Sequence, residues 1–96
     1  MLTAKNKALL KKLANPLEPS LVVGKGEIDA SLLQSVSLAL KAHELIKVKV
    51  LTNQKKTRAE VGAEIASKTA SEVVQIVGRI VVLYKKNEEK PLIVLG

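Results

Sequence analysis

The feature that most constrains the fold of this chain is the order in which strand-like and helix-like segments follow one another. The clearest strand pattern is at 45–52, where apolar residues at 46, 48 and 50 alternate with Lys47 and Lys49, so one face should be buried and one wet. Periodicity along the rest of the chain predicts helices at 1–14, 30–43 and 58–69, and strands at 20–24, 72–77 and 80–85. The predicted order is α-β-α-β-α-β-β.

This order predicts an α/β fold of the two-layer sandwich type. The first two strands flank a helix, so they should pair in parallel through a right-handed crossover. Gly78 and Arg79 predict a two-residue turn, and hence an antiparallel hairpin, between the last two strands. We therefore expect a mixed four-stranded sheet with the helices on one face, leaving Lys47 and Lys49 in solvent. A short additional strand is predicted at 92–95.

The helix ends and the size of the chain agree with a single domain. Thr3 and Asp29 are expected N-caps, and Pro16 should end the first helix. With 96 residues, of which 47% are apolar, the chain can build one core, and we expect one domain spanning 1–96.

Composition excludes several kinds of functional site. The chain has no Cys and one His, which excludes thiolate and multi-His metal sites, and we expect no metal and no cofactor. His43 is predicted on the apolar side of the second helix, where it would cap free carbonyls. No convergent set of catalytic groups is recognisable, so we expect no catalytic residues and no enzyme activity. Tyr84 is the only aromatic residue among Phe, Trp and Tyr, which removes the stacking platforms of common RNA-binding folds.

The charge balance favours a polyanionic partner. Sixteen Lys and Arg residues against nine Asp and Glu residues leave a net charge of +7. The first helix places leucines 2, 9, 10 and 13 on one side, which should dock on the core, and four lysines on the other. Those lysines, Lys5, Lys7, Lys11 and Lys12, form either a binding surface or a solvated face. No segment reaches the ~20 apolar residues needed to span a membrane, and we expect a cytoplasmic location.

The loop at 24–27 is the second candidate for anion binding. Gly24, Lys25 and Gly26 follow a strand and precede a helix, where glycines permit a sharp backbone path and free N–H groups attract an anion. The loop either holds an RNA phosphate, as the glycine loop of KH domains does, or is a plain βα turn. It lacks the spacing of a Walker loop.

Several runs together resemble a known family. They are Leu13 and Ala14 with Pro16, Leu17 and Pro19; then Val23–Gly26; then His43–Val50, which is the most distinctive run; and last 74–79 followed by 82–85. The chain resembles the CRM domain (chloroplast RNA splicing and ribosome maturation) in its stand-alone bacterial YhbY-like form. The resemblance implies a fold like the C-terminal domain of translation initiation factor three, RNA binding, and association with precursors of the large ribosomal subunit. Two positions depart from the family pattern: Glu27 stands at the second loop glycine, and Ala70 stands where a glycine often follows the third helix.

We therefore expect a non-catalytic RNA-binding protein of ribosome assembly that binds rRNA, acts as a monomer, and has no membrane or small-molecule partner. The alternative is a basic adaptor for an acidic protein. The expected RNA-binding residues are Lys5, Lys7, Lys11, Lys12, Gly24, Lys25, Gly26, Lys47, Lys49 and Arg79.

Overall fold

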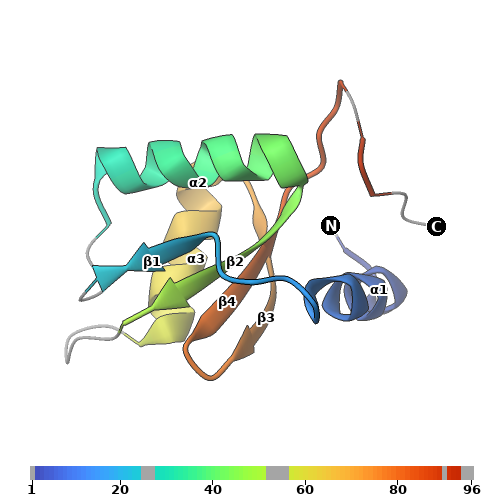
Figure 1. Cartoon of the computed structure of the whole chain (residues 1–96), viewed down its shortest axis with the longest axis horizontal. Helices are drawn as coiled ribbons and strands as arrows, with labels where there is room; N and C mark the ends of the chain where they lie inside the picture. Colours follow the sequence, from blue (N-terminus) through green and yellow to red (C-terminus); the bar gives the residue numbers. More distant parts are fainter. Residues whose placement is uncertain (1, 25–27, 52–56, 90, 94–96) are drawn as a thin grey trace.

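The computed structural model describes residues 2–24, 28–51, 57–89 and 91–93. It confirms the predicted order of elements (Figure 1). These are α1 (Ala4–Ala14), β1 (Leu21–Val23), α2 (Ala30–His43), β2 (Leu45–Val50), α3 (Arg58–Thr69), β3 (Glu72–Val77) and β4 (Ile80–Tyr84).

The four strands form one mixed sheet in the order β1-β2-β4-β3. β1 and β2 pair in parallel, whereas β4 pairs antiparallel with both of its neighbours. Gly78 has a φ of +56°, which suits the predicted tight turn between β3 and β4. The additional strand predicted at 92–95 is wrong for residues 92 and 93, which lie outside any strand, and its last two residues fall outside the described part of the chain.

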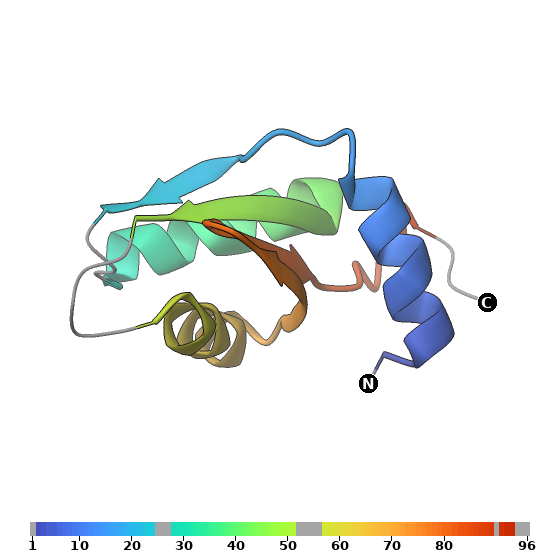
Figure 2. The same ribbon diagram turned by 90° about the horizontal axis from the view of Figure 1, so that it is seen from below.

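The helices occupy both faces of the sheet, which corrects the expectation that they share one. α2 and α3 cover the face that carries Ile46, Val48 and Val50, and this layer holds the larger core. α1 packs on the opposite face, where Leu10 contacts a cluster that includes Leu45. Figure 2 shows α1 standing across one end of the sheet, apart from the other two helices.

The physical reason lies at the start of β2. Leu45 and Ile46 are both buried, and consecutive strand residues point to opposite faces. The face with Lys47 and Lys49 is therefore apolar at its beginning, where Leu45 lies beside Tyr84 of β4. α1 covers this apolar end and leaves the rest of the face open.

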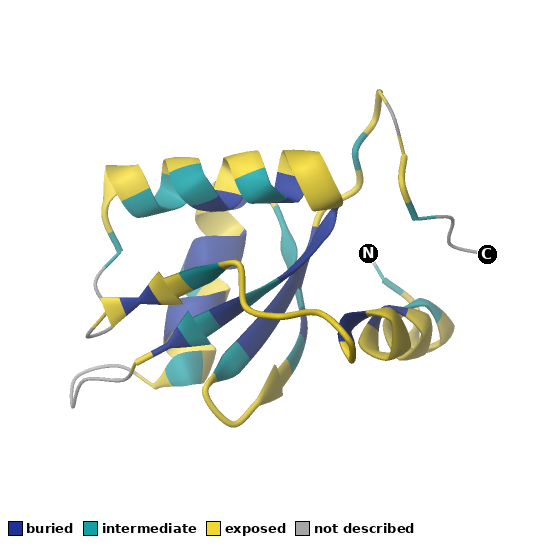
Figure 3. Cartoon of the chain, in the orientation of Figure 1, coloured by how far each residue is buried: buried dark blue, intermediate teal, exposed yellow. Residues whose placement is uncertain are grey.

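Only part of the apolar stripe of α1 reaches the sheet. Leu10 and Ala14, one turn apart, are fully buried, whereas Leu9 and Leu13 are 37% and 40% exposed. The expectation that all four leucines dock on the core is therefore wrong for Leu9 and Leu13. Figure 3 shows that the buried part of α1 lies toward its C-terminal end and that the rest of the helix is largely exposed.

Side-chain caps define the helix starts, as predicted for the first two helices. Thr3 accepts a hydrogen bond from the Asn6 N–H at 3.1 Å, and Asp29 accepts one from the Leu32 N–H at 2.7 Å. α3 ends at Ala70, whose φ of 55° is left-handed. An alanine therefore adopts the conformation that the family pattern assigns to glycine, at a cost of about 1 kcal/mol.

Candidate nucleic-acid interface

The four lysines of α1 form an exposed basic surface. Lys5, Lys7, Lys11 and Lys12 are all exposed, and at 100° per residue they cover an arc of about 160° away from the buried Leu10. The helix contains no acidic residue. Within the described ranges none of the four lysines has an ion-pair partner. Their ammonium groups are thus available to a partner with many negative charges.

A second group of candidate residues lies at the other end of the strands. β1 and β2 are parallel, so their carboxyl ends meet at one edge of the sheet, where Val23 pairs with Val50. The β3–β4 turn reaches the same edge, because the Val50 N–H donates to the Arg79 carbonyl at 2.7 Å. Gly24, which directly follows β1, and the exposed Arg79 are thereby brought to one edge.

Gly24 is exposed and is not required by the fold. Its φ is not left-handed, and a Cβ added there would meet no atom within 4 Å. Glycine is also used where a ligand must approach the backbone closely. The next three residues, Lys25, Gly26 and Glu27, lie outside the described residues, and α2 then begins after the Asp29 cap.

Lys47 and Lys49 share the open face of the sheet but differ in their contacts. The Lys47 ammonium donates to the Leu17 carbonyl at 2.9 Å and to the Asn15 carbonyl at 3.3 Å. It therefore holds the segment after α1, and the expectation that Lys47 points into solvent is wrong. Lys49 is half-buried and lies opposite Val22 of β1 and Ile80 of β4.

The candidate residues thus form two groups rather than one compact site. α1 packs where β2 begins, at Leu45, and the loop edge lies where β2 ends, at Val50. Five residue steps along a strand span about 17 Å. Lys49 lies between the two groups, so a long polyanion could contact both.

His43 does not occupy the predicted place on the apolar side of α2. It is exposed in the last turn of the helix. The helix is instead closed by the next residue, whose N–H donates to the Leu40 carbonyl at 2.7 Å. Since Tyr84 is 5% exposed and the chain has no Phe or Trp, His43 carries the one exposed aromatic ring among the described residues.

Glu44 is an important residue that sequence reasoning missed. Its side chain is fully buried, and its carboxylate accepts hydrogen bonds from the backbone N–H groups of Asn87 (2.6 Å), Leu92 (2.5 Å) and Ile93 (2.6 Å). Burial alone would raise the pKa of Glu44, but these three donors and the nearby charge of Lys86 outweigh it and lower that pKa. Glu44 therefore ties the segment after β4 to the end of α2.

The same buried region affects Tyr84. Burial raises the pKa of its hydroxyl, and the negative charges of Glu44, Glu72 and Glu88 raise it further. Tyr84 is thus a neutral core residue beside α1 and offers no face to a ligand. Across the described ranges no helix is long and apolar enough to cross a membrane.

Comparison with known proteins agrees with this arrangement. The model of the CRS1/YhbY (CRM) domain matches residues 2–85. The chain belongs to the CRS1/YhbY (CRM) domain family. This CRM domain is 38% identical over 95 residues to the "Probable RNA-binding protein YqeI" of Bacillus subtilis, covering 99% of both chains. It is also 38% identical to an "RNA-binding protein" of Haemophilus influenzae over 88 residues, covering 92% of this chain and 89% of that one.

A solved structure resembles this CRM domain over its full length. The solution structure of the hypothetical Staphylococcus aureus protein SAV1595, suggested to bind RNA, superposes with a TM-score of 0.85. The two proteins are 35% identical, and each covers 100% of the other. The three helices and the mixed four-stranded sheet are therefore those of this family.

Proposed function

We propose that this CRM domain, taken as one domain over residues 1–96, is a non-catalytic RNA-binding protein of the cytoplasm. The RNA that it binds is rRNA in precursors of the large ribosomal subunit, and the protein binds this RNA as a monomer. The observation that carries the proposal is the basic surface of α1, where four exposed lysines have no acidic neighbour in the helix. Such a surface suits phosphates, which attract lysine without regard to base sequence.

The loop edge supplies the second contact in this proposal. Arg79 offers a planar guanidinium that can donate two hydrogen bonds to one phosphate. Gly24, Lys25 and Gly26 would let the RNA backbone approach the start of α2, and Lys25 adds a positive charge. Lys49 extends the surface between the two groups. Two relatives that are 38% identical carry the names "Probable RNA-binding protein YqeI" and "RNA-binding protein", which supports this assignment.

Sedimentation of a cell extract tests the proposal directly. The tagged protein should co-migrate with a large-subunit precursor at low salt and move to the top of the gradient at high salt or after ribonuclease treatment. A matched variant with Lys5, Lys7, Lys11 and Lys12 changed to Gln should stay near the top. Retention in a particle that survives ribonuclease and contains an acidic protein would contradict RNA binding and favour the adaptor.

A further inference from the structure

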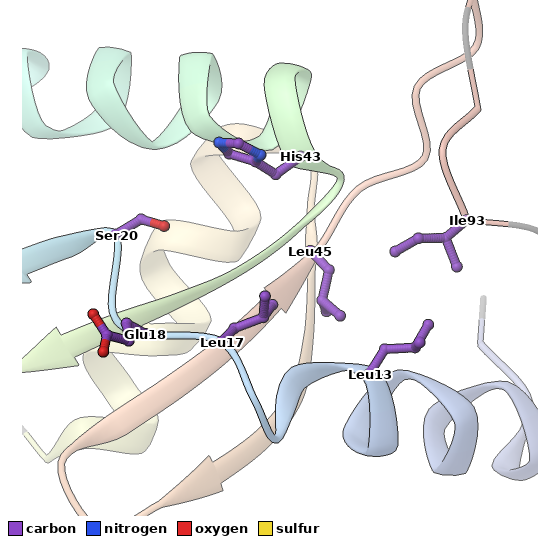
Figure 4. Close-up of a pocket in the computed structure, with 7 residues that line it drawn as sticks. All are labelled: Leu13, Leu17, Glu18, Ser20, His43, Leu45 and Ile93. Carbon is purple, nitrogen blue, oxygen red and sulfur yellow. The ribbon is translucent and has the colours of Figure 1, made fainter.

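An apolar groove lies beside the basic helix and is not used by the phosphate contacts proposed above. It has a volume of about 310 Å³ and lies between the end of α1, the segment after it, the end of α2 and residue 93. Its apolar walls are the side chains of Leu13, Leu17, Leu45 and Ile93 (Figure 4). This volume is at the lower end of the ~300–1,000 Å³ found for small-molecule sites.

The rim of the groove carries the exposed aromatic ring. Figure 4 shows the His43 ring extending from the last turn of α2 on the side of Ser20 and away from Leu13 and Ile93. No hydrogen bond joins the ring to any part of the protein that the structure describes. The exposed ring therefore lies at the rim of the groove.

The charges around the groove decide what kind of group can enter. Lys12 directly precedes Leu13 of the wall, so phosphates drawn to α1 would pass along its side. Glu18 lies on the rim itself and would repel a phosphate that entered. The groove thus favours a neutral, flat and largely apolar group attached to a chain of phosphates.

We propose that this groove binds a single unpaired base of the RNA, stacked on His43. The inference rests on the RNA binding proposed above and adds a contact that depends on a base. Bases outside a duplex stack on aromatic rings, histidine included. The protein would then prefer RNA that carries an extruded base over an uninterrupted duplex.

Two hairpin RNAs that differ at one position test the proposal. One carries an unpaired adenosine bulge, and the other carries an abasic residue there, so both have the same number of phosphates. By fluorescence anisotropy, the wild-type protein should bind the adenosine RNA about fivefold more tightly or better. His43→Ala and Leu17→Asn should remove this preference, whereas His43→Phe should retain it. Leu38→Ala, which removes an exposed side chain elsewhere on α2, should leave it unchanged.

The outcomes separate this proposal from the broader one. Equal wild-type affinity for both RNAs, or an equal loss for both in His43→Ala, overturns base stacking and leaves the phosphate contacts standing. Loss of the preference in His43→Phe also overturns base stacking, because phenylalanine keeps a flat aromatic ring and lacks only the ring nitrogens. Failure of the wild-type protein to bind either RNA overturns both proposals. Thermal unfolding of each variant confirms that it is folded.

Discussion

Replacement of Glu44 by glutamine tests how the segment after β4 is held. Three backbone N–H groups donate to the Glu44 carboxylate, from Asn87 on one oxygen and from Leu92 and Ile93 on the other. Glutamine keeps the size of the side chain but puts an NH₂ group where one oxygen had accepted. At least one N–H therefore loses its acceptor, and the other two face a neutral oxygen.

The cost follows from these hydrogen bonds. A buried donor left without an acceptor costs about 1–3 kcal/mol, and hydrogen bonds to a charged oxygen are roughly twice as strong as those to a neutral one. Together these losses amount to about 2–4 kcal/mol for Glu44→Gln. The cost cannot exceed the free energy needed to detach the segment after β4, because its N–H groups then form hydrogen bonds with water.

The pH dependence has a definite sign. Glu44 has a pKa below its ordinary value of 4.5 in the folded protein. Its contribution to stability is therefore fully present above about pH 4.5 and is lost as the pH falls through the lower folded pKa. Glutamine does not titrate, so the advantage of the wild type should be large at neutral pH and shrink in acid.

Urea unfolding of both proteins at pH 7 and at about pH 3 measures this difference. Amide hydrogen exchange adds a local readout, because the N–H groups of Asn87, Leu92 and Ile93 should exchange faster in Glu44→Gln at pH 7. Equal stability at pH 7, or a difference that persists undiminished in acid, would refute the reasoning.

Three further substitutions test individual residues. His43→Gln should change the free energy of unfolding by less than about 0.5 kcal/mol, because the ring is exposed. A larger loss of stability, measured by thermal unfolding, would show that His43 does cap the helix. Lys47→Met should cost about 0.5–1.5 kcal/mol because it removes two hydrogen bonds to backbone carbonyls, and the salt dependence of RNA binding should not change. Ala70→Gly should stabilise the fold by about 0.5–1 kcal/mol, because it relieves a left-handed alanine; unchanged or lower stability in urea would contradict this.

Local sequence signals predicted the elements and their order because those signals act within a few residues. Thr3 and Asp29 cap the predicted helices, and Gly78 with Arg79 forms the predicted turn. The parallel pairing of β1 with β2 followed from the helix between them. Each of these features depends on neighbouring residues or on general rules of chain connection.

The features that sequence did not predict depend on interactions between residues distant along the chain. Helical periodicity shows which residues of α1 share a side, but not that the Leu10 row rather than the Leu9 row meets the sheet. The alternating pattern of β2 predicts that Lys47 lies on the open face of the sheet. It does not predict that Lys47 contacts a backbone carbonyl in the segment after α1. Glu44 looks like an exposed charge between a helix and a strand, because its three partners lie more than 40 residues away.

The salt dependence of RNA affinity tests the central claim, that α1 binds RNA phosphates. The wild type is compared with a variant in which Lys5, Lys7, Lys11 and Lys12 are changed to Gln, and with a control in which two exposed lysines of the other helices are changed to Gln. The control residues are Lys41 of α2 and Lys68 of α3. For the α1 variant, the slope of log affinity against log salt should fall by about 0.7–0.9 for each phosphate that the helix no longer binds, while the control keeps the wild-type slope. Equal slopes in the α1 variant and the wild type would show that these lysines are only solvated and would contradict the account.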